Sequence, residues 1–556
     1  MRTFAGLLVS DNEPGGASSF LHIICVSLQS NLFELFMHEL IQLSLIPELA
    51  EKPELLTKQV ADKLEISPSR ITRLRTTKKS IDARSFQPKV NLTVEVYWDE
   101  PAPVMEKPVF NYQSVEGKTP VLIIGAGPAG LFAALRLIES GLRPIILERG
   151  KDAHTRKLDI AQLNRNNGIN AESNYCFGEG GAGTFSDGKL YTRSKKKGNT
   201  DRIFEIFHVH GAAEEILYDA HPHIGSDKLP QVIANISKTI TSCGGEIHFE
   251  QKLTEILIEN NQVVGCKTAD GTTYEAKALI LATGHSAHDV YEMLHNQGIA
   301  LESKGFAMGV RVEHPQALID SIQYHSKERD PYLPAASYNL VDQVNDRGVY
   351  SFCMCPGGHI VPAGSGQNEI VVNGMSASQR NSPFANSGMV VEIRPEDVPA
   401  EYQEYGVLAG LKFQQYVENL AYKNNGGLKQ VAPAQRLGDF VKGRLSADLP
   451  DCSYLPGLIS SPLHFWLPDI ISSRLREGFK KFDRKMHGYV TNDAVVVGVE
   501  TRSSSAVRVP RNPETGQHPV INGLFPAGEG SGYSGGITSS AIDGENAAGF
   551  VAKSLI

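Results

Sequence analysis

The sequence predicts an α/β fold built on a parallel sheet. Three observations support this prediction. A short apolar strand runs into a glycine-rich turn and an apolar helix at residues 121–139, and a second apolar strand follows at 143–148. Further apolar strands near residues 278 and 521 each end in a turn that contains glycine, and a helix follows the last of them. Strands and helices that alternate in this way are typical of a Rossmann-type sheet, with the turns at its carboxyl edge.

The composition is that of a globular, mildly acidic protein. The 556 residues include 54 lysines and arginines against 62 aspartates and glutamates, a formal net charge of −8, and 41% are hydrophobic. A chain of this length supplies about three or four domains. Its acidity argues against coating nucleic acid or anionic membranes by charge alone. No window has the run of about 18 apolar residues that a membrane-spanning helix needs.

The seven cysteines are too few, and odd in number, for a disulfide framework in so long a chain. We therefore expect a reducing compartment, namely the cytoplasm, or the plastid stroma if the source is a plant or alga. Residues 1–36 form an extension of unknown role. Asp11 and Glu13 precede its apolar run at 20–28, where a secretory signal needs basic residues.

Residues 37–100 predict a small α/β module. The spacing of apolar residues predicts strands at 40–49 and 90–98 and helices at 54–66 and 69–85. Basic residues crowd the second helix: Arg70, Arg73, Arg75, Lys78 and Lys79. One interpretation is a helix-turn-helix that binds nucleic acid, and the other is a solvated helix face. We favour the solvated face, because no base-reading pattern accompanies the charges. The proline-rich residues 101–118 predict a linker.

The turn at residues 125–130 carries the fingerprint G-x-G-x-x-G. Gly125 makes the tight turn, Gly127 lets the backbone approach a pyrophosphate, and Gly130 lets the helix lie close to the sheet. Pro128 and Ala129 stand at the start of the helix, whose N-terminal N–H groups point toward the phosphates.

The second strand of this unit ends in Glu148, 23 residues after Gly125, and Arg149 follows. An acid at this place accepts hydrogen bonds from the hydroxyl groups of an adenosine ribose. Both strands, the helix and the terminal acid are present, so we predict a dinucleotide-binding unit. The fingerprint alone serves NAD and FAD equally.

Two later segments favour FAD. The strand at 278–282 runs into Thr283 and Gly284, and the segment 521–555 contains a strand end, a glycine-rich turn and a helix. The three pieces in this order resemble the FAD-dependent oxidoreductases of the glutathione-reductase type. The resemblance implies that FAD is bound without a covalent bond and that the ATG turn lies near the dinucleotide.

The same resemblance assigns the late segment to the flavin. It implies that Gly528 and Glu529 lie by the ribityl and pyrophosphate, although the family more often has Asp where Glu529 stands. It further implies that the helix beginning at Gly535, Gly536 and Ile537 points its N-terminus at the isoalloxazine ring.

A second glycine-rich segment, YCFGEGGAGTFSDGKLYTR at 175–193, resembles a narrower group of bacterial and plastid-type proteins described only as FAD-dependent dehydrogenases. Successive N–H groups here form a nest for anionic oxygen, and the alternative is a flexible surface loop. We expect cofactor contacts from Gly180, Gly181, Gly183 and Thr184. No apolar strand precedes this segment, so it is not a second nucleotide domain.

Residues 303–489 alternate strand-like and helical runs, which predicts an inserted, β-rich α+β substrate domain. The FAD-binding domain is then discontinuous, at 119–302 and 490–556. No second βαβ fingerprint occurs between 303 and 498, so NADH or NADPH would serve only as a transient electron donor.

Four residues are candidates for a catalytic role. Cys353 and Cys355 form either a redox pair next to the flavin or two buried thiols. His285 is a general acid or the cap of a turn. Arg502 anchors a carboxylate or phosphate, or pairs with Glu500 or another buried acid. The sequence contains no metal-binding motif or hydrolase motif.

These observations predict an FAD-dependent dehydrogenase or reductase that transfers a hydride or electron pair between an organic substrate and an acceptor. We expect a small-molecule partner and no membrane span. The alternatives are a flavin monooxygenase and a nucleic-acid-associated flavoprotein that uses the basic N-terminal module.

Overall fold

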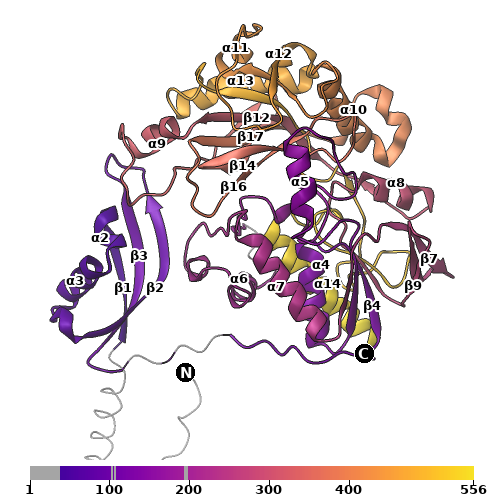
Figure 1. The fold of residues 1–556 in the computed structure, drawn as a ribbon, viewed down its shortest axis with the longest axis horizontal. Helices are drawn as coiled ribbons and strands as arrows, with labels where there is room; N and C mark the ends of the chain where they lie inside the picture. Colours follow the sequence, from indigo (N-terminus) through magenta and orange to yellow (C-terminus); the bar gives the residue numbers. More distant parts are fainter. Residues whose placement is uncertain (1–37, 102–103, 105–107, 193–197) are drawn as a thin grey trace, which may run out of the picture. The chain divides into compact units, whose positions relative to one another are not determined.

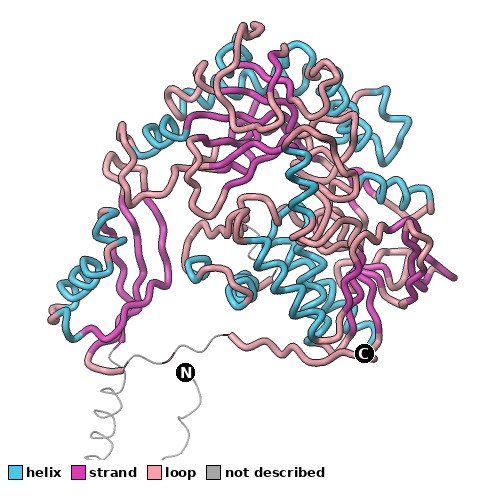
Figure 2. Tube along the Cα trace, viewed as in Figure 1, coloured by secondary structure: helices cyan, strands magenta, loops and turns pink. Residues whose placement is uncertain are grey.

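The computed structural model describes residues 38–101, 104, 108–192 and 198–556. The extension predicted at 1–36 lies outside these residues, as does part of the linker. The chain divides into two compact units, one made of the residues up to Lys79 with Val90–Glu106, and the other of the remaining residues (Figures 1 and 2). No helix in the described part of the chain is long and apolar enough to span a bilayer.

The small unit is an antiparallel sheet with two helices. Its strand order is β1-β3-β2, with β1 at His38–Leu45, β2 at Ile71–Asp82 and β3 at Lys89–Trp98. The helices are α2 (Pro47–Glu51) and α3 (Pro53–Leu64). Apolar side chains of β1, α3 and β3 form a separate core of Ile41, Val60, Val90, Leu92, Val94 and Val96.

The prediction of a second helix in this module is wrong. After the short 3-10 turn Pro68–Arg70 the chain runs as β2, because its β-branched residues favour a pleated strand over a helix. Arg75 pairs with Glu95 on β3, and Lys79 pairs with Glu51. A helix-turn-helix therefore does not form: Arg73, Arg75, Lys78 and Lys79 lie on the strand β2, and Arg70 ends the 3-10 turn before it.

The large unit contains a five-stranded parallel sheet of order β22-β10-β4-β5-β6. Its strands are β4 (Pro120–Ile124), β5 (Arg143–Leu147), β6 (Glu246–His248), β10 (Leu279–Leu281) and β22 (Leu524–Pro526). The order and direction confirm the predicted Rossmann-like sheet, with βαβ crossovers that place helices on its face.

Alternate residues of these strands enter two cores on opposite faces of the sheet. One face is covered by α4 (Pro128–Glu139), α6 (Thr200–Val209), α7 (Leu229–Ser242) and α14 (Ile537–Leu555), and α4, α7 and α14 lie side by side in Figure 1. The other face packs against β7 (Leu253–Glu259), β8 (Gln262–Thr268), β9 (Thr273–Glu275) and α8 (His288–Asn296).

The inserted domain, called the cap below, is a seven-stranded sheet of order β13-β14-β17-β12-β20-β18-β19. Its strands are β12 (Phe306–Pro315), β13 (Val341–Val344), β14 (Arg347–Cys355), β17 (Phe384–Ile393), β18 (Ala432–Arg436), β19 (Leu458–Ser460) and β20 (Val495–Glu500). Two short ribbons accompany it, β15 (Gly358–Pro362) with β16 (Val372–Ser376), and β11 (Glu302–Ser303) with β21 (Val507–Arg508).

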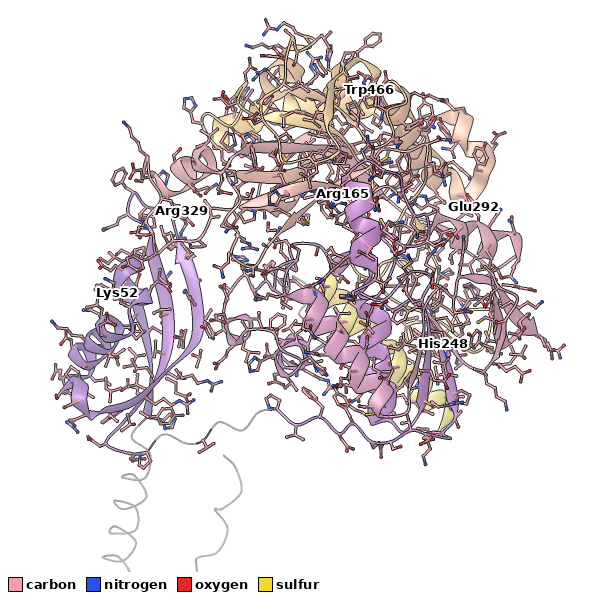
Figure 3. All side chains as sticks on the ribbon, viewed as in Figure 1. Lys52, Arg165, His248, Glu292, Arg329 and Trp466 are labelled. Carbon is pink, nitrogen blue, oxygen red and sulfur yellow. The ribbon has the colours of Figure 1, made fainter. Side chains whose placement is uncertain are left out.

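Helices cover the cap sheet: α9 (Gln316–Tyr324), α10 (Ala409–Lys423), α11 (Leu437–Lys442), α12 (Leu463–Trp466) and α13 (Asp469–Lys485). Trp466 lies among them on the outer side of the sheet (Figure 3). Strand β20 pairs with β12 and β18, so residues 495–500 belong to the cap sheet. The chain therefore leaves the cap later than the expected residue 489.

Candidate functional site

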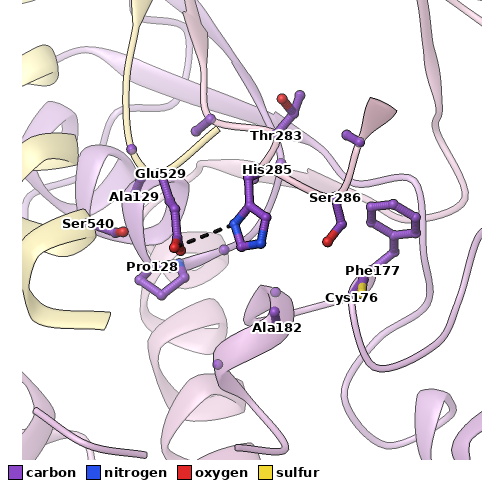
Figure 4. Close-up of a pocket in the computed structure, with 18 of the residues that line it drawn as sticks. Pro128, Ala129, Cys176, Phe177, Ala182, Thr283, His285, Ser286, Glu529 and Ser540 are labelled. Carbon is purple, nitrogen blue, oxygen red and sulfur yellow. Dashed lines mark ion pairs between the residues drawn. The ribbon is translucent and has the colours of Figure 1, made fainter. Parts of the chain in front are cut away.

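A cavity of about 350 Å³ opens at the carboxyl edge of the five-stranded sheet, where ligands bind in open α/β folds. Backbone from both glycine-rich segments, the ATG turn and the start of α14 lines it on one side, and Phe352 and Asn373 of the cap line the other. Figure 4 shows part of this wall. We call the whole cavity the main cavity.

Most of the predicted cofactor residues line this cavity. They are Gly125, Gly127, Pro128, Ala129, Glu148, Arg149, Gly181, Gly183, Thr283, Gly284, Gly528, Glu529, Gly535, Gly536 and Ile537. Among the catalytic candidates, His285, Cys353 and Arg502 line it too. The residues behind the wall are Gly130, Gly180, Thr184 and Cys355.

Close backbone approach explains the first glycine turn. Gly125 has φ +104°, and a Cβ there would lie 2.5 Å from the Ala282 carbonyl oxygen. A Cβ at Gly130 would lie 1.9 Å from the carbonyl oxygen of Gly125. Gly130 therefore acts through packing, which lets α4 begin at the cavity wall.

Glu148 ties the two glycine-rich segments together. Its buried carboxylate accepts hydrogen bonds from the backbone N–H groups of Ala126 (2.8 Å), Gly150 (2.9 Å) and Gly178 (3.0 Å). A carboxylate has about four lone-pair sites, so one remains for a ligand in the cavity. The acid that the fingerprint predicts is thus also a structural residue.

The second glycine-rich segment lies against the first turn. Gly180 and Gly181 take φ values of +77° and +65°, and a Cβ at Gly181 would lie 3.2 Å from the Cα of Gly127. The Thr184 hydroxyl donates to the carbonyl of Glu179 at 2.8 Å. The segment is therefore fixed by contacts, in contrast to the alternative of a flexible surface loop.

The sequence analysis missed Arg156, which holds this segment in place. This fully buried guanidinium donates to four backbone carbonyl groups at 2.7–3.0 Å, those of Asn174, Tyr175, Glu179 and Gly181. Burial lowers the pKa of Arg156 to about 10. Its position on α5 (Arg156–Asn164) carries no sequence signal that distinguishes it from a surface arginine.

Arg149 is held at the end of β5 by acidic partners. It donates to both carboxylate oxygens of Asp289 at 2.9 and 3.0 Å and to Glu172 at 2.7 Å. Its guanidinium lies 4.1 Å from the centre of the Phe177 ring, and Lys252 contacts the same two acids. This network fixes one end of the cavity.

A buried ion pair, which the sequence analysis also missed, fixes the turn before α14. The buried Asp543 carboxylate accepts from the Gly528 N–H at 2.7 Å and pairs with Arg511 through bonds of 2.6 and 3.0 Å. Arg511 also donates to the carbonyl of Pro526. Gly528 and Glu529 are thereby held at the cavity wall.

His285 and Glu529 face each other across the cavity wall (Figure 4). Nδ1 of His285 lies 3.4 Å from a Glu529 carboxylate oxygen, and Nε2 lies 2.8 Å from the carbonyl oxygen of Arg502. Burial opposes the charged imidazole, but the Glu529 carboxylate and the Arg502 carbonyl together hold the pKa of His285 above its ordinary value. His285 is thus a candidate proton donor at the cavity.

We predict a pH-dependent effect of Glu529→Gln. The pKa of His285 is raised in the folded protein, so its ion pair stabilises the fold below the unfolded pKa of about 6.5 and is lost as pH rises through the folded pKa. The variant should lose about 1 kcal/mol of unfolding free energy below about pH 6.5, and it should match the wild type only above the raised pKa of His285 in the folded protein. Thermal unfolding of the apoprotein across this range, with exposed Glu514→Gln as control, measures the difference. A pH-independent loss would contradict it.

Arg502 pairs with acidic side chains of the protein, which is the second of the two alternatives that the sequence left open. It donates to Glu418 at 2.8 and 3.0 Å, to Glu369 at 2.7 Å and to the Ser365 hydroxyl at 2.7 Å. Four of its five N–H donors are therefore used within the protein. Its acidic partners are the buried Glu418 and the partly buried Glu369. Glu500 is not among them, because it pairs with Arg311 at 2.7 Å.

The two cap cysteines are free and occupy different environments. Cys353 is partly exposed in the main cavity, whereas Cys355 is buried behind it. The Cys355 thiol donates to the carbonyl of Cys353 at 3.3 Å. The structure thus contains two thiols rather than a disulfide.

A second cavity of about 50 Å³ adjoins the main one and shares His285, Ser286 and Arg502 with it. Asn373 and Cys176 also line both cavities, whereas Val361, Ala363, Val371, Val372 and Glu500 line only the second. Burial raises the pKa of Glu500 to about 7, against the attraction of Arg311. The second cavity mixes apolar and polar walls, and its volume is far below the roughly 300–1,000 Å³ of a ligand pocket, so only a small group could enter it. Among the described residues, no group of three potential ligand side chains could hold a metal ion.

Three family models match the chain. Residues 119–307 match the pyridine nucleotide-disulphide oxidoreductases, residues 305–503 match the C-terminal domain-like region of FAD-dependent proteins, and residues 37–97 match a domain of unknown function. An uncharacterized protein of Clostridium beijerinckii is 40% identical over 508 residues, which cover 88% of this chain and 94% of that protein. A thiamine thiazole synthase of Aeropyrum pernix is 25% identical over 202 residues, 34% of this chain and 62% of that protein.

Solved structures that the comparison matched include the tetracycline destructase Tet(51), at 13% identity and a TM-score of 0.32, covering 79% of this chain and 83% of that one. The L-proline dehydrogenase of P. horikoshii has 13% identity and a TM-score of 0.33, and covers 79% of this chain and 94% of that one.

Proposed function

Because the chain belongs to the FAD-dependent oxidoreductase family, we propose that it binds FAD in the main cavity and transfers a hydride or electron pair between an organic substrate and an acceptor. The observation that carries this proposal is the cavity at the carboxyl edge of the parallel sheet, lined by both glycine-rich segments and the start of α14. When bound, the flavin supplies the redox chemistry, and the protein supplies position and electrostatics.

Exposed backbone and helix N-termini in the cavity wall support the binding of an anionic dinucleotide. A Cβ at Gly284, Gly535 or Gly536 would meet nothing within 4 Å, so bare backbone is exposed to the cavity there. Helices α4 and α14 both begin at this wall, and unsatisfied N–H groups at a helix N-terminus attract anionic oxygen. Predicted cofactor residues supply these groups.

The second cavity supports a substrate end that is small and largely apolar. Its valine and alanine walls would exclude water, and the Asn373 amide and Glu500 would orient a polar group. Glu500, with a pKa near 7, would hold or release a proton at its carboxyl group, and His285 would do so at its Nδ1. Arg502 would keep the wall between the two cavities in place through its buried acids.

NADH or NADPH would bind only transiently when it reduces the flavin. Residues 303–498 are all described, and they form the largely antiparallel cap sheet with its helices rather than a second parallel sheet. A nicotinamide would therefore have to enter the main cavity from its open side.

We predict that the purified protein carries a visible flavin absorption band. Heat release of the chromophore, followed by mass analysis, should identify FAD, because the first glycine turn fits a dinucleotide. The anaerobic spectrum is then recorded before and after NADPH is added. Bleaching within seconds supports a nicotinamide donor, whereas a persistent band supports electrons from the substrate or a protein donor.

A colourless protein that does not take up FAD on titration would overturn the proposed function. Oxygen dependence separates a dehydrogenase from a flavin monooxygenase. A monooxygenase would oxidise NADPH rapidly only with its substrate and O₂ both present, whereas a dehydrogenase would pass electrons to a dye under anaerobic conditions.

A further inference from the structure

Residues 188–191, at the end of the second glycine-rich segment, run along the wall of the main cavity in an extended conformation. They pair antiparallel with residues 222–224 through backbone hydrogen bonds of 2.8 and 3.1 Å. Side chains of an extended chain point alternately to opposite sides. Leu190 is fully buried in one of the two cores beside the parallel sheet, whereas Lys189 and Tyr191 line the main cavity. One face of residues 188–191 therefore presents a cation and an aromatic ring to the same space.

This face is held between the start of α14 and the cap. The Thr538 hydroxyl, in the first turn of α14, donates to the carbonyl of Leu190 at 2.7 Å. On the other side, Nζ of Lys189 donates to the carbonyl of Met354. Met354 belongs to a β-bulge of the cap sheet, where residues 353–354 of β14 stand opposite a single residue of β17. A molecule bound between α14 and the cap would therefore meet this face.

Lys189 is the cation of the main cavity whose charge is least neutralised by carboxylates. The other lysine and arginine side chains that line the cavity each lie within 3.0 Å of two acids, and they are Arg149, Lys252 and Arg502. Among the described residues, the closest carboxylate to Lys189 is that of Asp187, at 4.0 Å. Asp187 already binds Arg380 through bonds of 2.6 and 3.2 Å. Burial opposes the charged amine, but Cys355, Cys353 and Asp187 together raise the pKa of Lys189, so the ammonium persists at neutral pH.

Tyr191 supplies an aromatic ring beside this charge. Its side chain is half-exposed, and its ring lies 4.9 Å from the His221 ring, centre to centre, with 55° between the two planes. An aromatic ring that is fixed by such a contact offers a flat surface on which another ring can stack. Residues two apart in an extended chain are separated by about 6–7 Å. A flat molecule that carries an anionic group can therefore contact both Tyr191 and Lys189.

The surroundings of Lys189 favour a carboxylate over a phosphate. The phosphates of the dinucleotide are expected at the first glycine turn and at the N-terminus of α4, whereas Lys189 contacts the cap. One ammonium matches the single charge of a carboxylate, while a phosphate monoester carries about −1.5 to −2. Arg502, the anchor considered from the sequence, uses four of its five donors within the protein. Lys189 is thus the better-placed anchor for a carboxylate.

We infer that Lys189 and Tyr191 form the substrate-binding face of the main cavity, and that the substrate is a flat organic carboxylate. The ammonium of Lys189 pairs with the carboxylate, and the Tyr191 ring stacks on the unsaturated part of the molecule. This inference deepens the proposed function, on which the turnover of such a substrate rests.

The first test compares benzoate with benzamide, which has the same ring but no charge. Binding of each to the holoprotein is measured by titration calorimetry, and we expect benzoate to bind at least about tenfold more tightly. Lys189→Met should abolish this preference, and Lys189→Arg should retain part of it. Lys238→Met, at an exposed position on α7, is the matched control and should leave it unchanged.

A wild-type protein that does not bind benzoate, or binds it no better than benzamide, would overturn the inference. A preference that survives in Lys189→Met would do the same. If Lys189→Met does not fold, Lys189→Gln takes its place in the comparison, because its side chain is also uncharged.

The second test examines the ring with cyclohexanecarboxylate, which has the charge of benzoate but a puckered ring. We expect benzoate to bind about two- to tenfold more tightly, because only a flat ring stacks well on Tyr191. Tyr191→Leu should remove this difference, and Tyr191→Phe should keep it. Equal affinities for the two acids in the wild type, or a difference that persists in Tyr191→Leu, would contradict the role of Tyr191.

Flavin measurements on the same samples separate the substrate from the cofactor. Lys189→Met should retain its FAD. A loss of FAD affinity as large as the loss of benzoate affinity would assign the Lys189 charge to the cofactor and overturn the inference. A more negative flavin reduction potential with unchanged benzoate affinity would do the same. A protein without flavin that still prefers benzoate would overturn the proposed function alone, since calorimetry does not need the chromophore.

Discussion

Replacing Arg156 with methionine should remove most of the flavin-binding capacity and lower the free energy of unfolding by about 3 kcal/mol or more. The guanidinium is fully buried, and its donors satisfy the carbonyl groups of Asn174, Tyr175, Glu179 and Gly181. Each buried carbonyl left without a donor costs about 1–3 kcal/mol, part of which is offset because a charge no longer has to be buried. Thermal unfolding and flavin titration measure the two effects.

Two control variants separate the contribution of the Arg156 hydrogen bonds from that of its charge. Arg156→Lys keeps the charge, but a compact ammonium cannot reach four carbonyls in fixed directions, so we expect an intermediate loss. Arg136→Met removes an exposed partner of Glu139 and should change stability by less than about 0.5 kcal/mol. An Arg156→Met protein with normal flavin content and unfolding temperature would show that the glycine-rich segment holds its shape unaided.

The parts of the fold that the sequence predicts are those whose signal is local. The glycine spacing from Gly125 to Gly130 requires a tight turn followed by a close helix, and the structure contains both. The predicted strands of the cap also form, because their alternation or continuous apolarity fits a sheet with one or both faces buried. Local backbone geometry and burial leave a readable pattern in these segments.

Long-range contacts leave no such pattern. Arg156 contacts carbonyls 18 to 25 residues away, and Asp543 reaches the Gly528 N–H from the next helix. The acids that hold Arg502 come from other elements of the cap, so the sequence could state only that a buried acid was one alternative. For residues 71–82, alternation and β-branching compete with helical spacing, and pairing with β3 decides in favour of the strand.

Cys353 illustrates both what a local sequence pattern predicts and what only long-range pairing determines. Its two-residue spacing from Cys355 places both thiols on one face of a regular strand. The β-bulge removes that regularity, turns Cys353 toward the main cavity and leaves Cys355 behind it. The sequence marks both cysteines as candidates, and the register of β14 against β17 gives them different surroundings.

Two glycines of α14 should respond to the same substitution with opposite signs. A Cβ at Gly544 would lie 2.0 Å from the carbonyl oxygen of Ala129 and 2.9 Å from its Cα, where α14 crosses the first turn of α4. Backbone atoms cannot rotate away, so Gly544→Ala must push the helices apart and should cost about 1–3 kcal/mol or more. At Gly549 a Cβ meets nothing within 4 Å, and Gly549→Ala should stabilise the helix by up to about 1 kcal/mol.

The functional effect follows from where the two helices begin. Ala129 and Ile537, in the first turns of α4 and α14, both line the main cavity, so a shift at the crossing moves the cavity wall. We therefore expect Gly544→Ala to weaken FAD binding by much more than Gly549→Ala, measured by flavin fluorescence on titration of the apoproteins. Equal unfolding temperatures and equal flavin affinities in the two variants would show that the crossing is compliant. The spacing of α4 and α14 would then not determine the shape of the site.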